Sequence, residues 1–204
     1  NIFLFRMPKA ASAFLSKNIS SLANEYKEDP MIYGEDHLNL LRKMPKDWIA
    51  LTSIRHPVER LLSALFYADI VYNSPCSASR KKGAMDIGIW SHPNSFDEKT
   101  LEKKIKFLLK NKIVKSSVAE LYSCQPGFYH DNFNFFKSVD FMFIVEEMDI
   151  CLEAFEAKYN FGIKNKTTGA TKDNEINFYG KDRSEERNFL RNKYWDQLCI
   201  FYAE

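Results

Sequence analysis

The chain has 204 residues and a mass of 23.9 kDa, which is enough for one domain with a buried core. Its composition, with 45% hydrophobic and 15% aromatic residues, excludes an intrinsically disordered protein. Lys and Arg number 29 against 27 Asp and Glu, so the net charge of +2 does not indicate a nucleic-acid partner, and any anion site must be local. No apolar run approaches the ~20 residues that span a bilayer, so we predict a soluble chain without a membrane segment.

The first part of the chain alternates strand and helix patterns. Residues 2–5 form a short apolar strand pattern, and residues 12–26 show helical spacing with Ser12 placed as the cap. Residues 48–54 predict a second strand, and Pro57 opens a second helix, where its missing N–H costs nothing. Each of the two strands therefore leads directly into a helix.

The second part continues this pattern after a turn-rich excursion at residues 73–95. We predict further elements at residues 95–115 (helix), 140–145 (strand), 149–159 (helix) and 182–202 (helix), with a polar loop at 160–175. The alternation predicts one α/β domain over residues 1–204, with a central, mainly parallel sheet flanked by helices.

The segment between the first strand and the first helix has the properties of an anion site. Lys9 and Ser12 lie where free N–H groups of a helix N-terminus would meet the carboxyl end of a strand. The first glycine of the chain is Gly34, so neither a glycine-rich phosphate loop nor a dinucleotide fingerprint is present here. Taken alone, the segment also fits an ordinary turn with a capping serine.

A second candidate anion site follows the second strand. Arg55 ends that strand, and Ser63 lies two turns into the next helix. The planar guanidinium of arginine can donate two parallel hydrogen bonds to two oxygens of one phosphate. Two such sites on neighbouring strands predict a ligand with two separated phosphates.

At these two segments the sequence resembles the sulfotransferases that use 3'-phosphoadenosine 5'-phosphosulfate. Pro-Lys-Ala-Ala-Ser at residues 8–12 is similar to their first motif, and residues 55–63 fit R-x-P-x-x-R-L-L-S at every position. The resemblance implies a P-loop-like three-layer domain, the sulfotransferase fold. It also implies that the 3'-phosphate is held by Arg55 and Ser63, and the 5'-phosphosulfate by Lys9, Ala10, Ala11, Ser12 and Ala13.

Within this family the chain looks most like the carbohydrate 2-O-sulfotransferases that act on uronic acids. Residues 141–147 resemble a late strand of that family, and residues 165–168 resemble a basic loop that closes over the nucleotide. This makes Lys166, Thr167 and Lys172 candidate cofactor contacts, with a solvated polar loop as the alternative.

The resemblance also implies a general base upstream of the second motif, where His37 occupies the matching place. A histidine near its ordinary pKa of ~6.5 can accept a hydroxyl proton at neutral pH. Asp36 or Glu35 is the alternative base. The implied reaction is an in-line displacement in which Lys9 stabilises the departing phosphate oxygen. It requires no metal, and we interpret the Glu146 and Glu147 pair as structural.

The expected acceptor is a hydroxyl group, on a carbohydrate if the family likeness holds. Lysines throughout residues 97–115, with Arg80, Lys81 and Lys82, would suit a polyanionic polysaccharide, and an ordinary solvated helix face is the alternative. The Asn165 sequon falls on the predicted cofactor loop. We therefore favour the cytoplasm of a microbial cell over the Golgi lumen, which would require an anchor before the first residue.

Two other classes of function remain open. One is a small-molecule kinase, which the missing glycines disfavour. The other is a non-catalytic module that binds adenosine bisphosphate or a sulfated glycan. The four cysteines lack zinc spacing, although Cys76 and Cys124 could pair in an oxidising compartment while Cys151 and Cys199 fit core positions.

Overall fold

A computed structural model describes residues 2–5, 7, 10–11, 14–15, 18–19, 22–26, 35–73, 101–111, 128–160 and 183–203. The chain divides into two compact units, each built from two separate stretches of sequence. The first unit comprises Asn1–His56 and Tyr129–Asp173, and the second comprises Pro57–Phe128 and Asn174–Glu204.

The first unit is an α/β unit around a four-stranded parallel sheet. The strands are β1 (Ile2–Phe5), β2 (Leu22–Tyr26), β3 (Ile49–Ile54) and β4 (Phe141–Ile144), in the order β2-β1-β3-β4. Every pairing is parallel, with Leu4 opposite Leu51 between the two central strands. The predicted α/β class with a parallel sheet is therefore confirmed.

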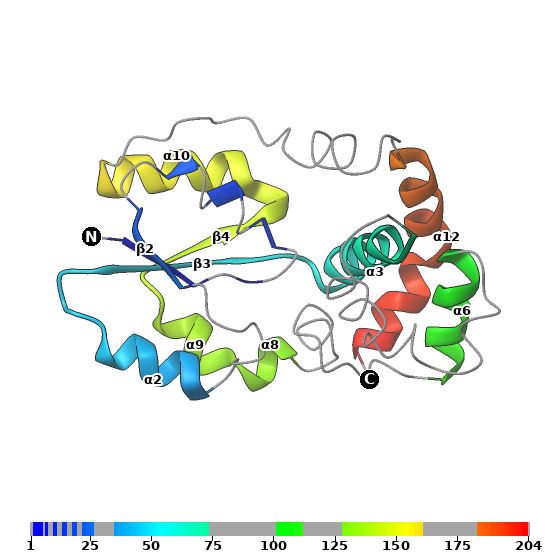
Figure 1. The fold of residues 1–204 in the computed structure, drawn as a ribbon, viewed down its shortest axis with the longest axis horizontal. Coiled ribbons are helices and arrows are strands. Elements are labelled where there is room, and N and C mark those ends of the chain that lie inside the picture. The colour runs from blue at the N-terminus through cyan, green and yellow to red at the C-terminus, as the bar shows by residue number, and fades with distance from the viewer. Residues whose placement is uncertain are drawn as a thin grey trace. The chain divides into compact units, whose positions relative to one another are not determined.

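Helices lie on both faces of this sheet, as Figure 1 shows. Helix α10 (Met148–Tyr159) covers one face, and helices α2 (Glu35–Lys43), α8 (Phe128–Asp131) and α9 (Phe133–Ser138) lie on the other side. A 3-10 turn, η2 (Val145–Glu147), connects β4 to α10.

The strands are apolar on both faces because both faces are buried. On the α10 face, a buried cluster joins the sheet to the first helical segment and to α10; its members are Ile2, Leu4, Phe14, Leu15, Ile19, Leu51, Phe143, Met148, Leu152 and Phe155. On the opposite face the ring of Phe5 packs edge-on against Phe135 of α9, with 5.2 Å between the ring centroids. Successive β1 side chains thus serve opposite layers, as the strand period requires.

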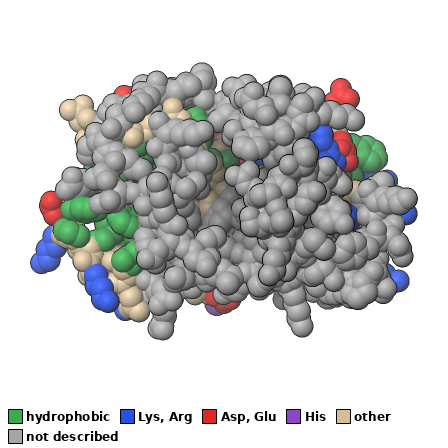
Figure 2. All heavy atoms as spheres, in the orientation of Figure 1, with side chains coloured by type: hydrophobic (Ala, Val, Ile, Leu, Met, Phe, Trp, Pro, Cys, Tyr) green, Lys and Arg blue, Asp and Glu red, His purple; other side chains and the backbone are tan. Residues whose placement is uncertain are grey.

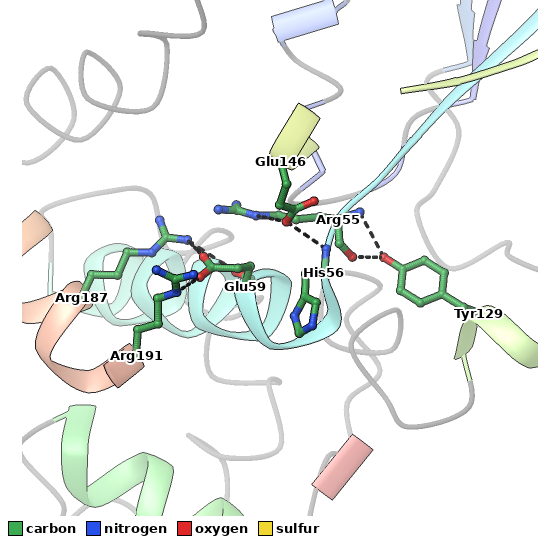
Figure 3. Close-up of polar contacts among 7 residues, drawn as sticks. All are labelled: Arg55, His56, Glu59, Tyr129, Glu146, Arg187 and Arg191. Carbon is green, nitrogen blue, oxygen red and sulfur yellow. Dashed lines mark hydrogen bonds and ion pairs between the residues drawn. The ribbon is translucent and has the colours of Figure 1, made fainter. Parts of the chain in front are cut away.

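The elements that the structure describes in the second unit are helices. The unit contains α3 (Pro57–Asn73), α6 (Leu101–Asn111) and α12 (Ser184–Ala203) around one apolar cluster. The α3 face that the sequence predicts, Val58, Leu61, Leu62 and Leu65, is fully buried in it. Glu59 in the first turn of α3 pairs with Arg187 and Arg191 of α12 (Figure 3).

One prediction about the elements needs correction. The helix predicted for residues 12–26 is wrong in its last part, since Leu22–Tyr26 is strand β2. Helices α2, α8 and α9 are not predicted from the sequence pattern. The other helices and strands agree with the sequence pattern where they are described, while residues 74–100, 112–127 and 161–182 lie outside the described residues.

Candidate functional site

The strand order defines where a ligand would bind to the sheet. From β1 the chain moves to one side to form β2, and it then returns past β1 to form β3 and β4 on the other side. The connections after β1 and β3 therefore leave the same edge of the sheet in opposite directions. Ligands of open α/β sheets bind in the crevice at such a switch point, outside the carboxyl ends of the strands. Both predicted anion motifs begin there.

The connection after β1 makes a tight turn into a helix. Ala10 N–H donates to Met7 O at 3.3 Å, and the N–H groups of Phe14 and Leu15 donate to Ala11 O at 3.0 and 3.1 Å. The C=O of Ala11 thus accepts the first helical hydrogen bond that is described, one residue before the serine predicted as the cap.

Ala11 adopts a left-handed conformation with φ of 56°. Such a φ is unusual for a residue with a Cβ atom and is the conformation that glycine adopts most readily. Turns with a left-handed residue can direct successive N–H groups toward an anion. Ala11 therefore adopts a conformation that is usually found for glycine, in a segment that contains no glycine. Lys9, Ser12 and Ala13 lie outside the described residues.

Arg55 is located at the carboxyl end of β3, as predicted, and Tyr129 and Glu146 are among the residues that contact it (Figure 3). The Tyr129 hydroxyl donates to Arg55 O at 2.7 Å and accepts from Arg55 N–H at 3.4 Å. The Glu146 carboxylate lies 3.9 Å from Arg55 Nε and also accepts the N–H of His56 at 3.0 Å. The side chain of Arg55 is only 12% exposed, so its orientation is constrained by its surroundings.

Ser63, the proposed partner of Arg55, is a half-buried residue of α3 and belongs to the second unit. The joint binding of one phosphate by Arg55 and Ser63 stays a prediction.

His37 falls in the first turn of α2, together with the alternative bases Glu35 and Asp36. Figure 1 shows α2 running antiparallel to β3, so this first turn is the end of α2 nearer the carboxyl edge of the sheet. The side chains of these three residues are not described, and their role stays a prediction. The same holds for Lys166, Thr167 and Lys172, which lie outside the described residues, as do Cys76 and Cys124.

Sequence reasoning missed Tyr129 and gave Glu146 no specific partner. Both lie far from Arg55 in sequence, 74 residues away for Tyr129, so no local spacing connects them. The only signal for Tyr129 is its place in the aromatic stretch of residues 128–136. Within the described part of the chain, no three His, Cys, Asp or Glu side chains form a group that could hold a metal ion.

The basic surface proposed for the acceptor is partly described on α6. Lys103, Lys106 and Lys110 are exposed there, whereas Lys104 is buried. Lys106 pairs with Glu102 at 3.3 Å, so part of this positive charge is neutralised within the helix. On the face drawn in Figure 2, the coloured charged side chains of the described residues are dispersed near the margins.

A comparison with protein-family models found no match, and neither the curated proteins nor the solved structures contain a significant match. Among the helices that the structure describes, none combines the length and the hydropathy needed to cross a membrane.

Proposed function

We propose that the chain is a sulfotransferase that moves the sulfuryl group of 3'-phosphoadenosine 5'-phosphosulfate to a hydroxyl of a carbohydrate acceptor, on a P-loop-like three-layer domain. The observation that carries this proposal is the location of two anion motifs at the carboxyl ends of the neighbouring strands β1 and β3, at the switch point of the sheet. Two further observations support the proposal: the left-handed turn at Ala11, which follows β1, and the constrained side chain of Arg55, which follows β3.

In this proposal the two phosphate groups of the donor bind to different loops. The 5'-phosphosulfate contacts the turn after β1, with Lys9, Ser12 and Ala13 beside the described Ala10 and Ala11. The 3'-phosphate contacts the guanidinium of Arg55 and the hydroxyl of Ser63, and Lys166, Thr167 and Lys172 cover the nucleotide.

The proposed chemistry is a single in-line displacement at sulfur. His37 removes the acceptor hydroxyl proton, and the acceptor oxygen forms a new bond to sulfur. The bond between sulfur and the phosphate oxygen breaks, and its electron pair leaves with adenosine 3',5'-bisphosphate. Lys9 and the N–H groups of the helix start stabilise the charge that develops on that oxygen.

Transfer of labelled sulfate to a panel of carbohydrate acceptors tests the proposal. We expect Lys9→Ala to lower the transfer rate by about 10²-fold or more, because it removes a charge that contacts the leaving oxygen. The control is Lys46→Ala, an exposed lysine in the loop before β3, at the opposite edge of the sheet. Full activity of Lys9→Ala would contradict the proposed role of the first loop.

Two further measurements, ATP turnover and nucleotide binding, separate the two other classes of function when they are made alongside the transfer assay. Magnesium-dependent turnover of ATP without sulfate transfer would identify a kinase. Binding of adenosine 3',5'-bisphosphate without transfer to any acceptor would identify a non-catalytic binding module.

A further inference from the structure

The turn between β3 and α3 is held by side chains rather than by sheet hydrogen bonds. The Tyr129 hydroxyl contacts both main-chain polar groups of Arg55, and Glu146 accepts the next N–H, that of His56. Pro57 follows and has no N–H to satisfy. Every N–H from Arg55 to the start of the helix therefore has a hydrogen-bond acceptor. The Tyr129 hydroxyl takes part in two of the three hydrogen bonds just named.

Packed aromatic rings fix the position of that hydroxyl. The ring of Tyr129 lies 5.4 Å from Phe136, which lies 5.3 Å from Phe135, and Phe135 lies 5.2 Å from Phe5. Phe135 and Phe136 are buried, so their rings have little freedom to move. The row reaches Phe5, the last residue of β1, which lies three residues before Pro8 of the first anion motif, and it continues to Phe3. The same row thus supports the starting points of both motifs.

The contacts of Tyr129 go to the main chain of Arg55, while the guanidinium group lies beside Glu146 (Figure 3). A main-chain anchor determines where the Cα atom lies, and with it the place that the guanidinium can reach. A guanidinium binds two oxygens of one phosphate at the same time only if the two groups are accurately placed. A small displacement of this Cα atom would therefore weaken phosphate binding.

We propose that Tyr129 is a positioning residue, which acts through Arg55 to set the preference for a nucleotide with a 3'-phosphate over one without it. This inference rests on the proposed function, in which Arg55 binds the 3'-phosphate. The 5'-phosphate is bound by the other loop, so loss of the Tyr129 hydroxyl affects the 3'-phosphate alone.

The test is calorimetric titration of the whole chain and its Tyr129→Phe variant with adenosine 3',5'-bisphosphate and with adenosine 5'-monophosphate. We expect Tyr129→Phe to reduce the ratio of the two affinities about five- to tenfold, as for the loss of one or two hydrogen bonds. Affinity for the monophosphate should stay unchanged, and this shows that the variant is folded.

Tyr159→Phe is the matched control, because its hydroxyl also donates to a main-chain oxygen, Asp140 O at 3.3 Å, at the other edge of the sheet. It should leave the ratio as it is. The inference is overturned if Tyr129→Phe keeps the ratio of the unmodified chain, or if it weakens both nucleotides equally. If the unmodified chain shows no preference for the bisphosphate, the proposed function itself fails.

Discussion

Ala11 carries a conformational cost at the place where the first anion motif turns into its helix. A left-handed φ is unfavourable for a residue with a Cβ atom by ~1–2 kcal/mol, and such positions are common at ligand sites. The chain retains alanine at a position where glycine would relieve this cost. The turn is therefore a local source of instability that stability measurements can detect.

We expect Ala11→Gly to raise the free energy of unfolding by about 0.5–1 kcal/mol, because the gain at positive φ exceeds the entropy that glycine loses. Urea unfolding followed by circular dichroism measures the change. The methyl group of the neighbouring Ala10 is fully buried, so Ala10→Gly, which removes that methyl group and adds main-chain freedom, should instead lower the free energy of unfolding. If both variants lost stability to the same extent, Ala11 would not be under strain.

For single residues, the sequence pattern indicates which ligand a side chain could bind. It does not indicate which other residues hold that side chain in place. Arg55 was predicted at a strand end because the apolar run of β3 stops at Ile54 and Pro57 starts a helix. Tyr129 could not be predicted as its partner. The sequence does not show which aromatic residue of the stretch 128–136 contacts the turn after β3. The partners of Glu146 could not be predicted either, because its contacts with Arg55 and His56 form only when β4 pairs with β3.

Among the elements, β2 shows how sheet pairing overrides local sequence. Residues 12–26 have helical spacing of apolar side chains, and Leu-Ala-Asn-Glu-Tyr contains no β-branched residue. The strand forms nevertheless because its main chain pairs with the edge of β1. In contrast, β3, α10 and α12 are long or strongly apolar, and their sequence patterns predict them closely.

The start of β4 is attached to β3 by a side chain as well as by the main chain. Asp140 Oδ2 accepts the N–H of Ala50 at 2.8 Å, and Asp140 N–H donates to Ala50 O at 2.9 Å. Lys158 Nζ and the Tyr159 hydroxyl donate to Asp140 O from α10. This residue therefore joins β3, β4 and α10 at one point.

Replacement of Asp140 by alanine should lower the free energy of unfolding by about 1–3 kcal/mol, because the N–H of the buried Ala50 loses its acceptor. Asp140→Asn keeps a side-chain oxygen of the same size and should cost less. Chemical denaturation of both variants provides the comparison, and equal losses would mean that the carboxylate hydrogen bond contributes little.

At the scale of the whole molecule, a carboxylate of the helical unit should contribute to acid sensitivity. Glu102 of α6 accepts hydrogen bonds from Lys193 Nζ and the Tyr194 hydroxyl of α12, both at 2.8 Å, and it also pairs with Lys106. These contacts, led by Lys193, lower the pKa of Glu102 from 4.5 to about 2. The ionised form is thus favoured in the folded chain.

A lowered pKa in the folded state gives stability that is fully present above the unfolded value of 4.5 and is lost as the pH falls toward 2. We expect the melting temperature of the unmodified chain to fall more steeply than that of Glu102→Gln between pH 4.5 and pH 2. The two curves should converge at the acid end. Glu153→Gln, an exposed carboxylate of α10, is the control and should follow the unmodified chain. Parallel curves for Glu102→Gln and the unmodified chain would refute this role.

The division of the chain into two interleaved units has a consequence for the rate of folding. Strands β3 and β4 are neighbours, yet the residues that join them, Ala50 and Asp140, are 90 positions apart, with Pro57–Phe128 of the helical unit between them. Closing such a long loop costs conformational entropy before the pairing returns any free energy, so contacts of this kind slow folding. The turn that carries Arg55 is held by Tyr129 and Glu146, both from beyond that loop. The candidate site should therefore be among the last parts of the protein to reach its final geometry.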